Sequence, residues 1–184
     1  MDYILQTEKI FKFLEFNLEL AQAKAIIKLK KTFNNDLNLI GGYIKDFLTL
    51  ENNGKISDDD YIYNDFVICF ENSKNKVSLI EKLTQYAKHY ITIIFEETKD
   101  RVLLNTIVSV NSCFAMEYYP FLMELMDKFL NKKIDSISYA LMLQSITDTV
   151  FRNFESEKQA NINLFDLRKE LENIITSRNE RIAI

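Results

Sequence analysis

Side chains able to act as nucleophiles or general bases are few in this chain, and none stands in a known catalytic arrangement. His89 is the only histidine, so a Ser-His-Asp or Cys-His arrangement would have to use it, and a two-histidine metal site is excluded. No arginine precedes His89 and no glutamate stands three residues before it. Both facts argue against helical ribonucleases and against paired Glu-x-x-His di-iron centres. We therefore interpret His89 as an ordinary helix residue and expect no catalytic histidine.

Three consecutive acids, Asp58, Asp59 and Asp60, form the one pattern that suggests a metal ion. A calcium loop requires alternate acids, a glycine at its sixth position and a glutamate at its twelfth, and this segment has neither. Consecutive acids at a helix start point in different directions, and the exposed amides of a first turn favour anions. We interpret the three aspartates as the beginning of a helix.

Cysteine and glycine usage adds no further chemistry. Cys69 and Cys113, the only cysteines, lie in apolar stretches outside any CxxC motif, which is typical of inert packing in a reducing compartment. Gly41-Gly42 lacks the Lys-Ser or Lys-Thr continuation of a phosphate-binding loop. We expect no enzyme activity, no metal and no cofactor. Because the N-terminal segment has no secretory pattern, we expect a cytoplasmic protein.

The elements that must carry these residues are predicted to be helices. The chain has 184 residues, 47% of them hydrophobic and 27% charged, with only three glycines and one proline. So few turn-forming residues disfavour a sheet with many hairpins. We predict an all-α fold, a single domain over 1–184 built as a compact bundle of seven or eight helices. The predicted helices are approximately 2–33, 37–50, 57–71, 77–97, 100–118, 121–131, 136–154 and 164–178.

Two of these helices carry specific predictions. The helix at 100–118 is apolar almost all round, so we place it at the centre of the core. Pro120 is predicted to end that helix and to begin the next, because the first turn of a helix does not use the missing amide.

A short pattern occurs twice, with its Lys-Ile pairs and its tyrosines both 78 positions apart. In each copy a Phe-Leu helix end is followed by a polar turn and by a second helix that Ser or Asp caps. Gly54 is a candidate for a left-handed position at the first of these turns. We predict a helical-hairpin pseudo-repeat with halves 36–97 and 118–182. The copies are Phe47-Leu48, Gly54-Lys55-Ile56-Ser57 and Tyr61, and Phe129-Leu130, Lys132-Lys133-Ile134-Asp135 and Tyr139.

Charge is uneven along the chain. The net charge of −4 argues against a general nucleic-acid binder, and no apolar stretch is long enough to cross a bilayer. The segment 36–65 holds seven acids and two lysines, a balance of −5. This segment is either a solvated acidic surface or a docking face for a cationic partner. Tyr61 and Tyr63 beside it either pack at a helix end or contribute to a protein-binding surface.

The segment 47–66 resembles bacterial toxin-immunity proteins of the colicin D immunity type. It has a Phe-Leu helix end, the turn Gly54-Lys55-Ile56-Ser57, an acidic helix start and then Phe66. The segment 123–139 repeats this pattern with Asp135 in place of the serine. Phe165-Asp166-Leu167-Arg168-Lys169-Glu170-Leu171 is similar to the last helix of that family.

The resemblance implies a non-catalytic inhibitor that covers the basic active site of a cytosolic nuclease toxin with an acidic helical surface. A viral or phage helical modulator, Bcl-2-like or anti-defence, that binds a host protein is one alternative, and an apolar surface groove would favour it. A metal-dependent enzyme that uses carboxylates alone is another, and it would need acids converging in a pocket. The contact residues implied for the inhibitor are Asp58, Asp59, Asp60, Tyr61, Tyr63 and Asp65.

Overall fold

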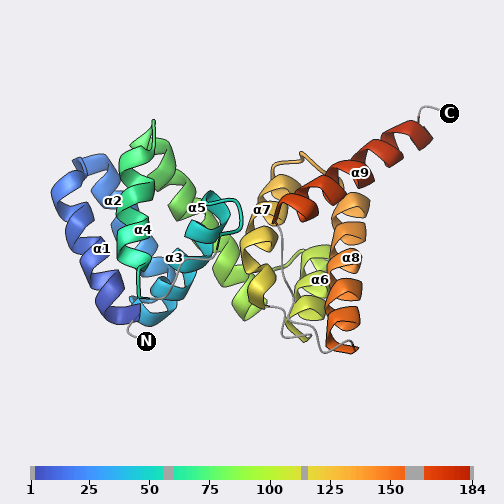
Figure 1. Cartoon of the computed structure of the whole chain (residues 1–184), viewed down its shortest axis with the longest axis horizontal. Coiled ribbons are helices and arrows are strands. Elements are labelled where there is room, and N and C mark those ends of the chain that lie inside the picture. Colours follow the sequence, from blue (N-terminus) through green and yellow to red (C-terminus); the bar gives the residue numbers. More distant parts are fainter. Residues whose placement is uncertain (1–2, 56–59, 113–115, 156–163, 183–184) are drawn as a thin grey trace. The chain divides into compact units, whose positions relative to one another are not determined.

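Helices account for all the regular structure in the described part of the chain, residues 3–55, 60–112, 116–155 and 164–182 of the computed structural model (Figure 1). The all-α prediction is therefore confirmed. The α-helices are α1 (Tyr3–Asn17), α2 (Leu20–Thr32), α3 (Leu37–Glu51), α4 (Ile62–Asn72), α5 (Lys76–Phe95), α6 (Arg101–Ser112), α7 (Tyr119–Leu130), α8 (Ser136–Glu155) and α9 (Leu164–Ile182), with a short 3₁₀ helix, η1, at Met116–Tyr118.

The chain divides into two compact units, Met1–Ile91 and Thr92–Ile184. Helices α1 to α4 belong to the first unit and α6 to α9 to the second, while α5 carries the chain from one to the other. The single-domain interpretation stays a prediction. Each unit has its own buried apolar side chains, and each is described here by itself.

In the first unit, α3 is buried over much of its length. Helices α1, α3 and α4 pack against one another, and α3 buries residues on nearly every side of its second half. The ring of Tyr43 is fully buried, and its hydroxyl donates a hydrogen bond to the carbonyl oxygen of Leu83 on α5. A buried hydroxyl needs such a partner, so this bond lets a large polar side chain join an aromatic core with Phe33, Phe47 and Tyr90.

The contact between α1 and α3 depends on a residue without a side chain. A Cβ atom placed on Gly41 would lie 2.8 Å from Cβ of Tyr3 and 2.9 Å from Oγ1 of Thr7. The Thr7 hydroxyl is buried, and it lies 2.6 Å from the carbonyl oxygen of Tyr3 and 3.1 Å from that of Leu37. Gly41 therefore marks a close helix crossing, while Gly42 would place its Cβ no closer than 3.4 Å to the Tyr90 hydroxyl.

In the second unit, α7 takes the central position that the sequence suggested for the helix at 100–118. That prediction is wrong, because α6 ends at Ser112 and leaves Asn105, Val108 and Ser109 exposed. The residues Tyr119 to Met126 of α7 are buried, with the exception of Glu124. Pro120 stands in the first turn of α7, as predicted.

Glu124 joins α7 to α9. Its carboxylate receives hydrogen bonds from Nε of Arg168 at 2.8 Å and from Nζ of Lys128 at 2.6 Å. Burial alone would raise the pKa of Glu124, but the hydrogen bonds and charges of Arg168 and Lys128 lower it below its usual value. The ion pair is therefore present at neutral pH and holds α9 against α7.

The predicted first helix, 2–33, is two helices in the structure. Helix α1 ends at Asn17, and α2 begins after Glu19, which forms a reciprocal capping box with Gln22. The apolar spacing continues through this break, so periodicity alone did not reveal it. Because the predicted first helix is two helices, the described residues contain one α-helix more than the eight that were the upper limit of the prediction.

Both copies of the repeated pattern end their helix in the same way. Asn53 and Lys132 have φ values of 54° and 56°, and in each turn the next amide bonds back to the carbonyl five residues earlier, at 2.8 Å. Helix α2 ends with the same geometry at Asn34 (φ 52°), so the turn is not special to the two copies. The matching tyrosines differ, since Tyr61 is 57% exposed and Tyr139 is 2% exposed. The pseudo-repeat stays a prediction.

Gly41→Ala is expected to lower the free energy of unfolding by about 2 kcal/mol, because the new methyl group forces α1 away from α3. Gly42→Ala is the matched control on the same helix. It is expected to leave stability unchanged or to raise it by about 0.5–1 kcal/mol, since alanine favours a helix interior. Urea unfolding of both variants, followed by circular dichroism, measures the difference. Equal effects of the two substitutions would contradict the close crossing.

Candidate protein-binding surface

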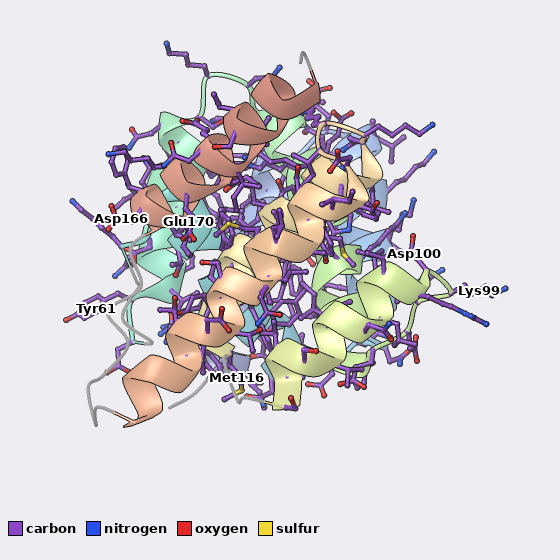
Figure 2. The ribbon with its side chains drawn as sticks, turned by 90° about the vertical axis from the view of Figure 1, so that its right-hand side faces the viewer. Tyr61, Lys99, Asp100, Met116, Asp166 and Glu170 are labelled. Carbon is purple, nitrogen blue, oxygen red and sulfur yellow. The ribbon has the colours of Figure 1, made fainter. Side chains whose placement is uncertain are left out.

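The predicted contact residues lie at the start of α4 and in the segment before it. Asp58 and Asp59 lie outside the described residues, as does Ser57. Asp60 is exposed, and Tyr61 is the residue that precedes the first turn of α4. Figure 2 shows the Tyr61 side chain pointing outward from the ribbon. An exposed tyrosine next to an exposed carboxylate offers a partner both apolar area and a negative charge.

Gln6 of α1 holds this segment in place. Its Nε2 donates to the carbonyl oxygen of Asp60 at 3.0 Å, and its Oε1 accepts from the amide of Tyr63 at 3.1 Å. One amide side chain thus satisfies a donor and an acceptor at the helix start, where backbone groups lack partners within the helix. The position of Asp60 and Tyr61 is therefore set by α1.

The other two predicted residues are less accessible. Tyr63 is half-buried, and its ring meets the ring of Phe13 edge to face, with centroids 6.5 Å apart. Asp65 is half-buried in the first turn of α4, where the helix dipole favours a negative charge. Both residues have roles in packing or helix stability besides any contact with a partner.

Two other acids of the 36–65 segment are engaged within the protein. The carboxylate of Asp36 accepts from the amides of Asn38 and Leu39 and caps α3. Glu51 forms an ion pair with Lys82 of α5. The charge balance of −5 therefore overstates the negative charge that a partner would meet.

Asp46 is mostly buried on α3, and burial is the main reason that its pKa rises from 3.8 to about 7. The positive charge of Lys45 and a hydrogen bond from the Tyr90 side chain act in the opposite direction. At neutral pH this carboxyl is only about half ionised. A single buried carboxyl with a raised pKa can serve chemistry, but it can equally be a structural residue of the α3–α5 contact.

Neither of the other reactive side chains lies in a site. His89 is buried, and its ring meets Tyr86 edge to face at 5.5 Å. The thiol of Cys69 is free and half-buried, and burial raises its pKa to about 11, so little thiolate forms at neutral pH. Cys113 lies outside the described residues. In the part of the chain that the structure describes, no three His, Cys, Asp or Glu side chains come together as a metal site.

A second surface, which the sequence did not single out, lies between α1 and α2. A hollow of about 200 Å³ opens there. Ile27, one of its lining residues, is 54% exposed, and Leu20, seven residues earlier on the same side of α2, is 77% exposed. The signal in the sequence is an excess of apolar positions over 2–33, more than one buried face of a helix requires. The residues lining the hollow are Phe11, Leu14, Glu15, Leu18, Ala23, Ile26, Ile27 and Lys30.

No protein-family model matches this chain, and searches of curated proteins and of solved structures find no similar protein. Among the described residues, no helix has both the length and the apolar character needed to span a bilayer. Function therefore has to be inferred from these two surfaces.

Gln6→Ala is expected to lower the free energy of unfolding by about 1 kcal/mol, because two hydrogen bonds at the start of α4 are lost. Amide hydrogen exchange at residues 60–65 should become faster in this variant. Asn17→Ala, which removes only a bond from the side chain to Phe13 within α1, is the control and should leave that exchange unchanged. Unaltered protection at 60–65 in Gln6→Ala would show that Gln6 does not position the segment.

Asp46→Asn is expected to stabilise the protein at pH 8 by about 2 kcal/mol and to have little effect at pH 4. The folded state raises the Asp46 pKa, so it holds a proton that the unfolded chain releases between about pH 4 and pH 7. The stability that this carboxyl contributes is complete below pH 4 and is lost as the pH rises through 7. Urea unfolding from pH 4 to 8 measures this. Substitution of the exposed Glu81 by Gln is the control. If the free energies of unfolding of Asp46→Asn and of the unchanged chain differ by the same amount at every pH, the raised pKa of Asp46 is contradicted.

Proposed function

We propose that this chain is a non-catalytic, cytoplasmic inhibitor of the immunity-protein type, which binds the basic surface of a nuclease toxin. The acidic face it uses is centred on the start of α4. The observation that carries the proposal is the exposed pair Asp60 and Tyr61, held in a defined position by the two hydrogen bonds of Gln6. Asp58 and Asp59 extend the negative charge of this segment along the chain.

The electrostatics of the segment favour a contact that depends on a few residues. Asp36 and Glu51 are engaged within the protein and Asp46 is mostly buried, so the proposal assigns the contact to Asp58, Asp59 and Asp60. A small cluster of exposed charges mainly speeds and orients association with a cationic partner. The aromatic ring of Tyr61 then supplies buried area, as tyrosines commonly do in interfaces.

A second candidate is a helical modulator that binds another protein through an apolar groove. The hollow between α1 and α2 favours it, because an apolar groove is the feature that such a modulator requires. The two candidates use different surfaces of the first unit and are tested separately.

The acidic-face proposal is tested by titrating the chain with the purified nuclease domain encoded beside its gene, at increasing NaCl. Replacing Asp58, Asp59 and Asp60 by Asn is expected to weaken binding at least tenfold at low salt, about 1.4 kcal/mol or more, because three charges facing a cationic surface are lost. The difference should shrink as salt screens the interaction.

The control variant carries Glu8→Gln, Glu81→Gln and Glu97→Gln, which removes the same number of charges from exposed positions elsewhere. It should bind as the unchanged chain does. Binding that resists both salt and the loss of the three aspartates would exclude the acidic face as the inhibitory surface.

A further inference from the structure

The hollow between α1 and α2 has the size of a protein side chain. Its volume of about 200 Å³ is below the roughly 300–1,000 Å³ of typical small-molecule sites. Apolar side chains from both helices form most of its wall, and Glu15 and Lys30 are its polar members. Lys30 places its ammonium group 4.1 Å from the ring centroid of Phe11, so its charge is partly engaged. The hollow suits one apolar side chain of a partner.

Exposed apolar side chains continue the surface beyond the hollow. Ile27, which lines the hollow, is 54% exposed, and Leu20 is 77% exposed. Leu20 and Ile27 stand seven residues apart on α2, so they lie on the same side of that helix. Isolated exposed apolar residues are common, but a group beside an apolar hollow is typical of an interaction site.

Helix α2 contributes little to the core, and it is basic. Only Ile26 and Leu29 are buried among its residues, and it contains four lysines and no acid. Lys30 and Lys31 lie in the last turn, where the negative end of the helix dipole favours cations. Lys24 and Lys28 lie outside that turn, so the dipole does not explain them. Within the described residues, Lys24, Lys28 and Lys31 are exposed and form no ion pair.

From these observations we infer that the α1–α2 surface binds an acidic amphipathic helix of another protein, which inserts one apolar side chain into the hollow and directs carboxylates toward the lysines of α2. This inference gives the second candidate function a partner of defined chemistry and does not depend on the acidic face at α4. The lysines of α2 favour a partner that carries carboxylates, because opposite charges attract across an interface. The apolar wall of the hollow favours a partner helix with an apolar stripe.

The opposite side of the hollow argues against an anionic membrane or a nucleic acid as the occupant. Glu15 of α1 lines the hollow and is exposed, and the exposed Glu19 follows at the turn into α2. These carboxylates would repel a surface of phosphates, whereas a helix can place its own acids on the α2 side only. A concave site between two helices also fits a helix better than it fits a flat bilayer.

The test uses the full chain and a fluorescently labelled synthetic helix of 18 residues, with leucines on one face and glutamates beside them. Fluorescence anisotropy measures the affinity, and amide chemical shifts locate the contact. The expected result is saturable binding with shift changes at 11–31. A scrambled peptide of the same composition, whose leucines share no face, is expected to bind at least about tenfold more weakly.

Two variants and their controls locate the contact. Two variants are each expected to weaken peptide binding at least about fivefold. One carries Ile27→Asp, and the other combines Lys24→Gln, Lys28→Gln and Lys31→Gln. Leu141→Asp is the control for Ile27→Asp. The triple variant Lys74→Gln, Lys88→Gln and Lys99→Gln is the control for the loss of three lysines from α2. All four control residues are exposed and lie outside α1 and α2. Lys99 extends into solvent in Figure 2. Circular dichroism confirms that each variant folds.

Three results would overturn the inference. They are equal binding of the scrambled peptide, binding to phosphatidylserine vesicles that Ile27→Asp abolishes, and a dimer in sedimentation that Ile27→Asp dissociates. The Asp58, Asp59 and Asp60 variant should bind the peptide normally, and the α2 variants should bind the nuclease normally. Failure of one proposal is thereby distinguished from failure of the other.

Discussion

The close approach of α1 to α3 at Gly41 is the constraint on which both candidate surfaces depend. Because no side chain separates the helices, Tyr3 and Thr7 lie directly on α3, and the Thr7 hydroxyl reaches the carbonyl oxygen of Leu37. This contact places α1, whose Gln6 then holds the start of α4. The later turns of α1 form one wall of the hollow beside α2. A change in this one crossing would therefore shift the acidic residues and the apolar hollow together.

The distribution of charge shows why a count of acids along the chain is a poor guide to a surface. Asp36 caps a helix, Glu51 forms an ion pair and Asp46 is mostly buried. The cap and the ion pair favour the fold, whereas the burial of Asp46 costs stability as the pH rises from about 4 to 7. The basic helix α2 keeps exposed cations that α1 to α5 do not neutralise within the described residues. The first unit thus has an exposed acidic residue at the start of α4 and a basic, partly apolar surface at α2.

Much of the secondary structure could be predicted because its signals are local. A cap at Asp135 is predicted from the second copy of the repeated pattern, and its carboxylate accepts a hydrogen bond from the amide of Ser138 at 2.7 Å. Pro120 was placed correctly for the same reason, since its effect needs only its own ring. The break between α1 and α2 was missed because Glu19 and Gln22 form a capping box that lacks the usual Ser or Thr. The exposed face of α6 was missed because Val108 is apolar and its exposure is decided by its neighbours.

By itself, the sequence determined that the chain is helical, where most helices begin and end, and that its few reactive side chains form no known catalytic motif. These properties follow from backbone preferences and short-range hydrogen bonds, which a few adjacent residues control. Only the tertiary structure decided which acids remain accessible, that Gln6 positions Asp60, and that α1 and α2 leave a hollow between them. The physical reason is that burial, ion pairing and helix crossing join residues far apart in the chain, so their outcome depends on packing.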